Sequence, residues 1–171
     1  VRLPTGLHWN VLQLWQEIQQ GVALAAKTLG GVPTSVGIDT WGVDFGLLDC
    51  NGVLIGLPYH YRDSRNDGMI EAACQVVPRA EIFGQTGIQF MQLNSLYQLL
   101  AMVRQRSPVL DIAHTFLTIP DLFNYWLTGQ KVCEFTNATT TQCYNPLTGA
   151  WAKGLVGQLG IPTHIFPEIV E

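Results

Sequence analysis

The chain has 171 residues, of which 47% are hydrophobic and 13% are charged, and its formal net charge is −4. This length is enough for one domain with a real core, and the apolar fraction excludes a disordered chain. No run of Lys or Arg offers a surface for nucleic acid, and no stretch approaches the roughly 18 apolar residues that a membrane span needs. We therefore expect no nucleic-acid partner and no membrane association.

The first residue is Val1 rather than Met, and charged residues are scarce against the roughly 25% of a typical domain. Both features lead us to expect a piece of a larger protein. The four cysteines, at positions 50, 74, 133 and 143, are widely spaced and form no C-x-x-C motif. This spacing argues against a disulfide scaffold and a structural metal, and it favours a reduced, cytoplasmic protein.

In chain order, the first predicted element is a helix over residues 11–29, where apolar residues recur with the spacing of one buried helical face. Asn10 is the expected N-cap, and Gly30 follows the last turn as a stop signal. Two apolar runs at 35–38 and 43–48 predict strands joined by a polar corner. An Asn51–Gly52 turn then leads to a third predicted strand.

The second half of the chain is expected to be mostly helical. The predicted helices cover 67–77, 79–85, a segment beginning at Asn94–Ser95, a short segment from 107, 120–127 and 152–159. Pro78 separates the first two, and Gly129 ends the helix over 120–127. Residues 136–142 are β-branched and polar, which predicts a strand or an ordered loop. The elements together indicate a mixed α/β fold.

The corner at residues 37–45, with the sequence GIDTWGVDF, combines two acidic residues with a Trp between apolar runs. A glycine at such a corner lets a ligand approach the backbone closely. The alternative is a tight connection in which Asp39 or Asp44 accepts hydrogen bonds from turn amides. Both interpretations remain open from the residues alone.

Two further segments contain groups that suit a polyol. Residues 59–65, YHYRDSR, place aromatic rings beside Arg and Asp, and residues 135–142, FTNATTTQ, offer hydroxyls and amides. The first could instead hold an internal Arg–Asp pair that fixes a loop, and the second could be a solvated edge strand. A single His between tyrosines, as at His60, is weak evidence for catalysis.

These segments resemble the FGGY family of carbohydrate kinases over nearly the whole chain and in the same order. The matching segments are SVGIDTWGVDFGLLD at 35–49, LPYHYRDSR at 57–65, GIQFMQLNSLYQL at 87–99, IPDLFNYWLTG at 119–129 and FTNATTTQ at 135–142. The runs GIDTWGVDF and YRDSR together are most similar to the members of the family that act on L-rhamnulose.

The resemblance implies part of an actin-like ATPase domain of the ribonuclease-H-like type, with a mixed sheet and flanking helices. It also implies ATP-dependent phosphorylation of L-rhamnulose at its 1-hydroxyl, in rhamnose catabolism, with Mg²⁺ on the phosphates. A ketose is therefore the expected small-molecule partner. Two alternatives stay open: a family member acting on another ketose or polyol, and a non-catalytic sugar-binding or interaction module.

For the site, the resemblance implies that Gly42 contacts the ketose beside Trp41, with Tyr61 and Asn94 as further substrate-binding positions. Asn137 is expected near the same cleft. We expect Gly42 to tolerate no side chain, because a Cβ atom there would take up sugar volume.

Residues 1–171 are expected to form part of the N-terminal domain. The family's phosphate loop would lie upstream, and its catalytic aspartate and second domain would lie downstream. We therefore assign no catalytic, cofactor-binding or metal-binding residue in this chain, and we expect it alone to bind no ATP or Mg²⁺ and to lack kinase activity. Exposed strand edges around residues 36–48 are expected to promote self-association.

Overall fold

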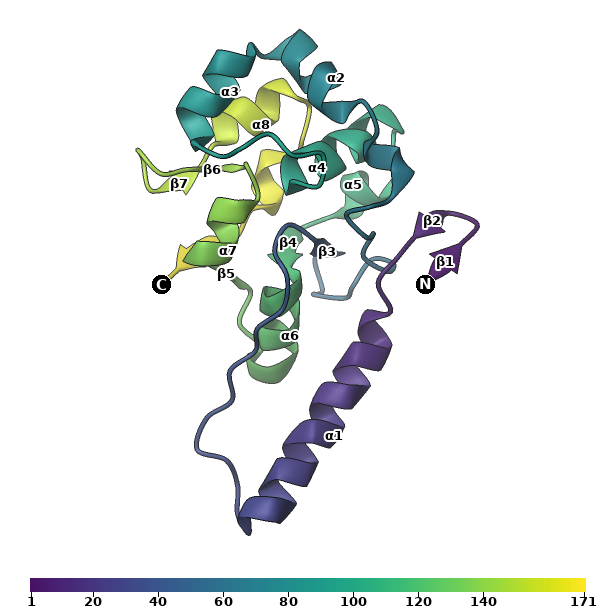
Figure 1. Cartoon of the computed structure of the whole chain (residues 1–171), viewed down its shortest axis with the longest axis vertical. Coiled ribbons are helices and arrows are strands. Elements are labelled where there is room, and N and C mark those ends of the chain that lie inside the picture. Colours follow the sequence, from purple (N-terminus) through teal and green to yellow (C-terminus); the bar gives the residue numbers. More distant parts are fainter.

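A computed structural model describes all of residues 1–171 as helices around short strand pairs (Figure 1). The strands are β1 (Arg2–Leu3), β2 (Gly6–Leu7), β3 (Phe45–Leu48), β4 (Thr115–Thr118), β5 (Val132–Glu134), β6 (Tyr144–Asn145), β7 (Ala150–Trp151) and β8 (Glu168–Val170). The helices are α1 (Val11–Leu29), α2 (Met69–Val76), α3 (Arg79–Thr86), α4 (Ser95–Arg104), α5 (Val109–Ile112), α6 (Ile119–Thr128), α7 (Phe135–Thr140) and α8 (Lys153–Gln158). None of the helices combines the length and apolar character that a membrane crossing requires.

Helix α1 has the predicted bounds, and its caps are the predicted ones. The Asn10 side chain accepts a hydrogen bond from the backbone N–H of Gln13, and Gly30 ends the helix with a φ of 68°. The expected fully buried face is wrong, however, because only Val11 is buried. The start of α1 packs against α6, whereas its far end projects from the body (Figure 1), and Leu29 is 72% exposed.

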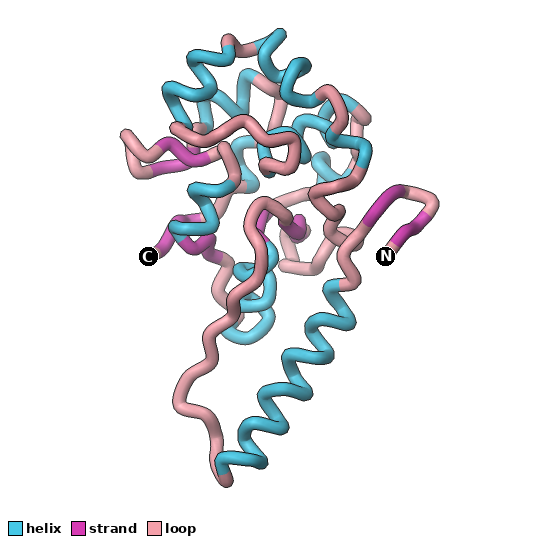
Figure 2. Tube along the Cα trace, viewed as in Figure 1, coloured by secondary structure: helices cyan, strands magenta, loops and turns pink.

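The strand predictions were only partly right. Strand β3 forms and pairs antiparallel with β4, with Phe45 opposite Thr118. Residues 35–38, by contrast, belong to an extended loop (Figure 2), and Val36 is 48% exposed. A strand needs a hydrogen-bonded neighbour, and none of the 171 residues lies in register beside this loop. The third predicted strand is reduced to one bridge between Leu48 and Leu54.

The helices of the second half follow the prediction closely, with one exception at residues 136–142. Most of that segment belongs to helix α7 rather than to a strand or loop. The Glu134 carboxylate caps this helix by accepting hydrogen bonds from the backbone N–H groups of Thr136 and Asn137. The threonine hydroxyls bond to carbonyls three residues earlier. These local bonds override the β-preference of the threonines.

The main core lies between α4, α8 and the β3–β4 pair. Tyr97, Leu99 and Phe116 are fully buried there. Antiparallel pairs and one parallel pair, β5 with β8, occur in four separate two-stranded sheets. The mixed α/β class is confirmed. This core holds β3 and the start of α4 in place, and the candidate site is built directly on both.

Candidate functional site

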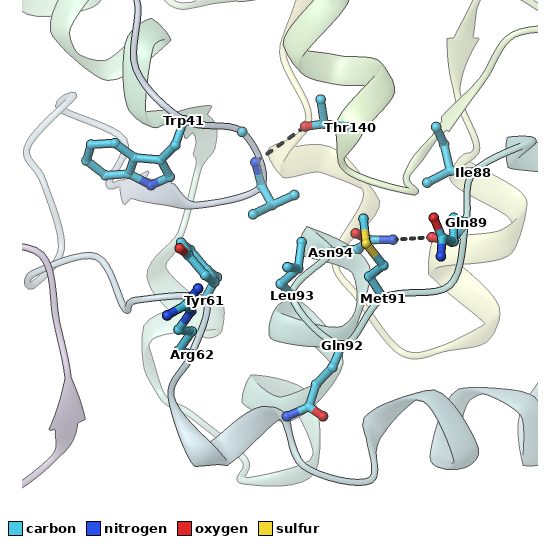
Figure 3. Close-up of a pocket in the computed structure, with 12 residues that line it drawn as sticks. Trp41, Tyr61, Arg62, Ile88, Gln89, Met91, Gln92, Leu93, Asn94 and Thr140 are labelled. Atoms are coloured by element: carbon cyan, nitrogen blue, oxygen red, sulfur yellow. Dashed lines mark hydrogen bonds between the residues drawn. The ribbon is translucent and has the colours of Figure 1, made fainter.

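A cavity of about 800 Å³ opens where four separate segments of the chain meet (Figure 3). It is lined by Trp41, Gly42, Val43, Tyr61, Arg62, Ile88, Gln89, Met91, Gln92, Leu93, Asn94 and Thr140. Aromatic side chains from the corner before β3 and from the loop after it form one wall. The loop before α4 forms the opposite wall, and α7 closes the end with Thr140.

Four of the five residues that the sequence predicted for the site line this cavity: Trp41, Gly42, Tyr61 and Asn94. Asn137 does not. It lies on α7 about one turn before Thr140, and its backbone carbonyl accepts a hydrogen bond from the Thr140 hydroxyl. The sequence prediction missed Thr140 itself, although the polar run FTNATTTQ was the signal that contained it.

The backbone at Val43 is held in a conformation that a β-branched residue rarely adopts. Its φ is 69°, in the left-handed region. The Val43 N–H donates to Thr140 Oγ1 (3.3 Å), and its carbonyl accepts from Ser95 Oγ (2.5 Å) and Gln98 Nε2 (3.3 Å). Such a conformation costs on the order of 1–3 kcal/mol and persists only where its surroundings fix it. Helices α4 and α7 thus hold the cavity floor in a strained turn.

Asp44, the next residue, is fully buried and accepts hydrogen bonds on both carboxylate oxygens. Its Oδ2 accepts from the indole Nε1 atoms of Trp9 (2.5 Å) and Trp41 (3.0 Å). Oδ2 also accepts from the Tyr61 backbone N–H (3.3 Å), and Oδ1 accepts from Gln98 Nε2 (2.8 Å). Burial raises the pKa of Asp44, and the hydrogen bonds offset part of that shift. Two of the four donors are indoles, and neither amide belongs to the corner at 37–45, so the interpretation as a turn-amide acceptor is wrong for Asp44.

A row of aromatic rings forms the wall behind this carboxylate. The ring centroids of Trp41 and Trp9 are 4.0 Å apart, those of Trp9 and His60 4.3 Å, and those of His60 and Tyr61 4.4 Å. Burial lowers the pKa of His60, although the nearby Asp44 charge opposes the shift. The His60 imidazole packs between the rings of Trp9 and Tyr61, and its Nδ1 accepts a hydrogen bond from the Arg62 backbone N–H (3.0 Å).

The alternative of an internal Arg–Asp pair in the YRDSR run is only half right. Asp63 does fix the loop, but its carboxylate accepts from the backbone N–H groups of Leu7 (2.6 Å) and Arg65 (3.0 Å). The Arg65 guanidinium instead lies over the Tyr59 ring, 3.7 Å from its centroid. Burial lowers the pKa of Arg65 to about 10.

The opposite wall holds an amide whose orientation is set by its neighbours. Gln142 Nε2 donates to the Ile88 carbonyl (3.3 Å), so Gln142 Oε1 is left to accept from Asn94 Nδ2 (2.9 Å). Asn94 Nδ2 also donates to the Gln89 carbonyl (2.9 Å; Figure 3). Asn94 Oδ1 has no hydrogen-bond partner. This oxygen is buried, so the wall keeps one unsatisfied acceptor beneath its surface.

The lining of the cavity includes no His, Cys, Asp or Glu side chain that could ligate a metal ion. The chain places no three His, Cys, Asp or Glu side chains together where they could hold a metal. The sequence also has no glycine-rich phosphate loop of the GxxxxGK[ST] or GxGxxG type. We therefore derive no chemical step through ATP or Mg²⁺ from this chain.

Comparison with known proteins identifies the family of the chain. Residues 3–171 match the profile of the N-terminal domain of the FGGY family of carbohydrate kinases. Rhamnulokinase of Oceanobacillus iheyensis is 42% identical over 161 residues, which cover 94% of this chain and 34% of that protein. Rhamnulokinase of Pectobacterium atrosepticum is 44% identical over 163 residues, covering 95% and 33%. The chain thus spans about a third of the length of these relatives.

Solved structures show the same fold at low sequence identity. Xylulose kinase from Rhodospirillum rubrum superposes with a TM-score of 0.88 at 20% identity, covering 99% of this chain and 36% of that one. Plasmodium falciparum glycerol kinase with ADP gives a TM-score of 0.84 at 17% identity, covering 98% and 35%. The family match spans almost every residue, and the chain belongs to the FGGY family of carbohydrate kinases.

Proposed function

We propose that this chain forms the ketose-binding wall of a kinase that transfers the γ-phosphoryl group of ATP to the 1-hydroxyl of L-rhamnulose. The observation that supports this most is the meeting of two distant runs in one cavity. Trp41 and Gly42 come from GIDTWGVDF, and Tyr61 comes from the run that ends in YRDSR. The two curated rhamnulokinases described above are 42% and 44% identical to the chain, which favours this ketose over others.

The lining groups suit a sugar in two ways. The rings of Trp41 and Tyr61 offer apolar faces for the C–H face of a sugar, and amides on the opposite wall offer hydrogen bonds to its hydroxyls. A fixed sugar presents one hydroxyl in one place, and positioning is the main contribution of a protein to phosphoryl transfer. We assign binding and orientation to this chain, with ATP and Mg²⁺ as the proposed co-substrate and cofactor of the activity. A cytoplasmic location accords with four free cysteines.

A hybrid enzyme tests the proposal. The 171 residues replace the matching third of the Pectobacterium rhamnulokinase, and turnover of L-rhamnulose, D-xylulose and glycerol is measured with ATP and Mg²⁺. We expect kcat/KM to be highest for L-rhamnulose. A preference for D-xylulose or glycerol would assign another substrate. A folded hybrid that phosphorylates none of them would favour a non-catalytic module. Calorimetric titration of the 171-residue chain with L-rhamnulose gives a second test that needs no turnover.

A further inference from the structure

The Asp44 carboxylate is buried, and donors from four residues converge on it. They are the indole N–H groups of Trp9 and Trp41, the backbone N–H of Tyr61 and the amide of Gln98. Moving a carboxylate from water into a protein interior is costly unless several hydrogen bonds replace its hydration. Burying the Asp44 carboxylate therefore costs free energy, and the arrangement of its hydrogen-bond partners indicates its role.

Only an ionised carboxylate matches this set of partners. All four groups donate, and a carboxylate is the one side-chain group of this size that accepts on both arms and donates nothing. An asparagine would turn its NH₂ group toward either the indoles or Gln98. The shape would be kept, but one donor would face another.

Two of the four partners line the cavity, and the other two do not. Trp41 and Tyr61 form the aromatic wall, and each is tied to the same oxygen, Asp44 Oδ2. Trp9 lies behind them, between the rings of Trp41 and His60, and joins the start of α1 to the wall. One atom thus sets the spacing between a ring that precedes β3 and a loop that follows it.

We propose that Asp44 is a positioning residue of the ketose site, which acts through Trp41 and Tyr61 without touching the ligand. The proposal rests on the proposed function for its ligand, but the arrangement of the indoles can be tested without any ligand. A carboxylate that is merely structural would affect stability alone. A positioning carboxylate also affects how well the ketose binds.

The kinetic test compares two buried carboxylates. Asp44→Asn in the hybrid enzyme should raise the KM for L-rhamnulose, or lower kcat, by about tenfold to a hundredfold, since a 1 Å misplacement can cost on the order of 10² in rate. The KM for ATP should not change. Asp121→Asn is the matched control, because Asp121 is also buried but bonds to Thr118 and the Glu134 backbone, away from the cavity. Equal KM and kcat values for L-rhamnulose in the two folded variants would overturn the proposal.

The spectroscopic test uses the 171-residue chain alone. In ¹⁵N-labelled protein, Asp44→Asn should shift the indole N–H signals of Trp9 and Trp41. The Trp151 signal should stay in place, since its indole donates to the Pro167 carbonyl (2.7 Å). Unmoved Trp9 and Trp41 signals would overturn the proposal whatever the hybrid does. An unsubstituted hybrid that does not phosphorylate L-rhamnulose would instead overturn only the proposed function.

Trp9→Phe covers the case in which Asp44→Asn does not fold. This change keeps an aromatic ring behind the wall and removes one hydrogen bond to Asp44 Oδ2. Trp9 does not line the cavity, so a ligand contact is not lost. We expect a severalfold rise in the KM for L-rhamnulose with an unchanged KM for ATP. Unchanged kinetics in this variant would contradict the proposal.

Discussion

Gly42→Ala should destabilise the chain, and Thr140 should be the cause. An ideal Cβ atom at Gly42 would lie 3.0 Å from Thr140 Oγ1 and 3.3 Å from both Thr140 Cβ and Cγ2. The structure thus adds a second reason to the one given from sequence, because the nearest protein atoms to the new methyl group belong to Thr140 in the cavity wall. The Thr140 hydroxyl cannot move freely, since it donates to the Asn137 carbonyl at 2.8 Å.

The magnitude follows from two opposing effects. Overpacking a tight site costs about 1–3 kcal/mol, and replacing Gly with Ala where φ is not positive returns about 0.4–1 kcal/mol through the unfolded state. We expect the free energy of unfolding to fall by about 1–2 kcal/mol. In a Thr140→Ala background, which lacks Oγ1 and Cγ2, the same change should cost about 1 kcal/mol less, the size of an ordinary contact coupling.

Urea unfolding of the four proteins in this cycle measures the coupling. Gly37→Ala is the matched control, because no heavy atom lies within 4 Å of its Cβ position and its φ is not positive. That variant should be as stable as the wild type or slightly more so. An equal cost of Gly42→Ala in both backgrounds would refute the role of Thr140.

Four further predictions concern the rest of the chain. Burial raises the pKa of the Asp121 carboxyl group from 3.8, so the native state binds the carboxyl proton more tightly than the unfolded chain does. The free energy of unfolding of the wild type should therefore fall relative to that of Asp121→Asn as the pH rises above 4, which urea titrations at a series of pH values measure. For Glu134, slight burial raises the pKa but hydrogen bonds from residues 136 and 137 outweigh it, so the net pKa is lowered. Glu134→Ala should cost about 1 kcal/mol near neutral pH, and the difference should fade as the pH drops below the ordinary value of 4.5; a constant difference would contradict this. Self-association was expected through strand edges at 36–48, but residues 43–48 are buried, so only the exposed start of that stretch can contribute. Val36→Lys should therefore reduce association at high concentration in light scattering, whereas identical scattering would exclude a role for Val36. The 171-residue chain alone should not turn over L-rhamnulose in a coupled ATPase assay, and turnover above the buffer rate would refute this.

The elements predicted correctly were those set by local signals. Asn10 and Gly30 define the ends of α1, Pro78 separates α2 from α3, and Gly129 ends α6 with a φ of 77°. Each signal acts within a turn of the helix it bounds, so no knowledge of the rest of the fold is needed.

The predictions that failed did so because strand pairing depends on distant residues, or because a local capping signal was not recognised. The run at 35–38 has the composition of a buried strand, but pairing depends on a neighbour that the run itself does not encode. The prediction also missed β4 at Thr115–Thr118, whose partner β3 lies about 70 residues earlier. Helix α7 was missed for a local reason, because the capping role of Glu134 was not recognised.

The candidate site shows the same division. Trp41, Gly42, Tyr61 and Asn94 were predicted from sequence, and they line one cavity. The role of Asp44 was not predicted, because its bond to Trp9 joins residues 35 positions apart. A motif indicates which side chains matter, whereas the network that orients them depends on the fold.

The most direct test of the account is a titration of the ¹⁵N-labelled 171-residue chain with L-rhamnulose, followed through the indole N–H signals of its five tryptophans. Trp41 lines the cavity, and Trp9 donates to the same Asp44 oxygen as Trp41 does. Trp151 lies in the main core. The account predicts a saturable shift of the Trp41 signal, a smaller shift of Trp9 and none of Trp151. A well-dispersed spectrum in which Trp41 does not respond to L-rhamnulose would contradict the claim that this cavity binds the ketose.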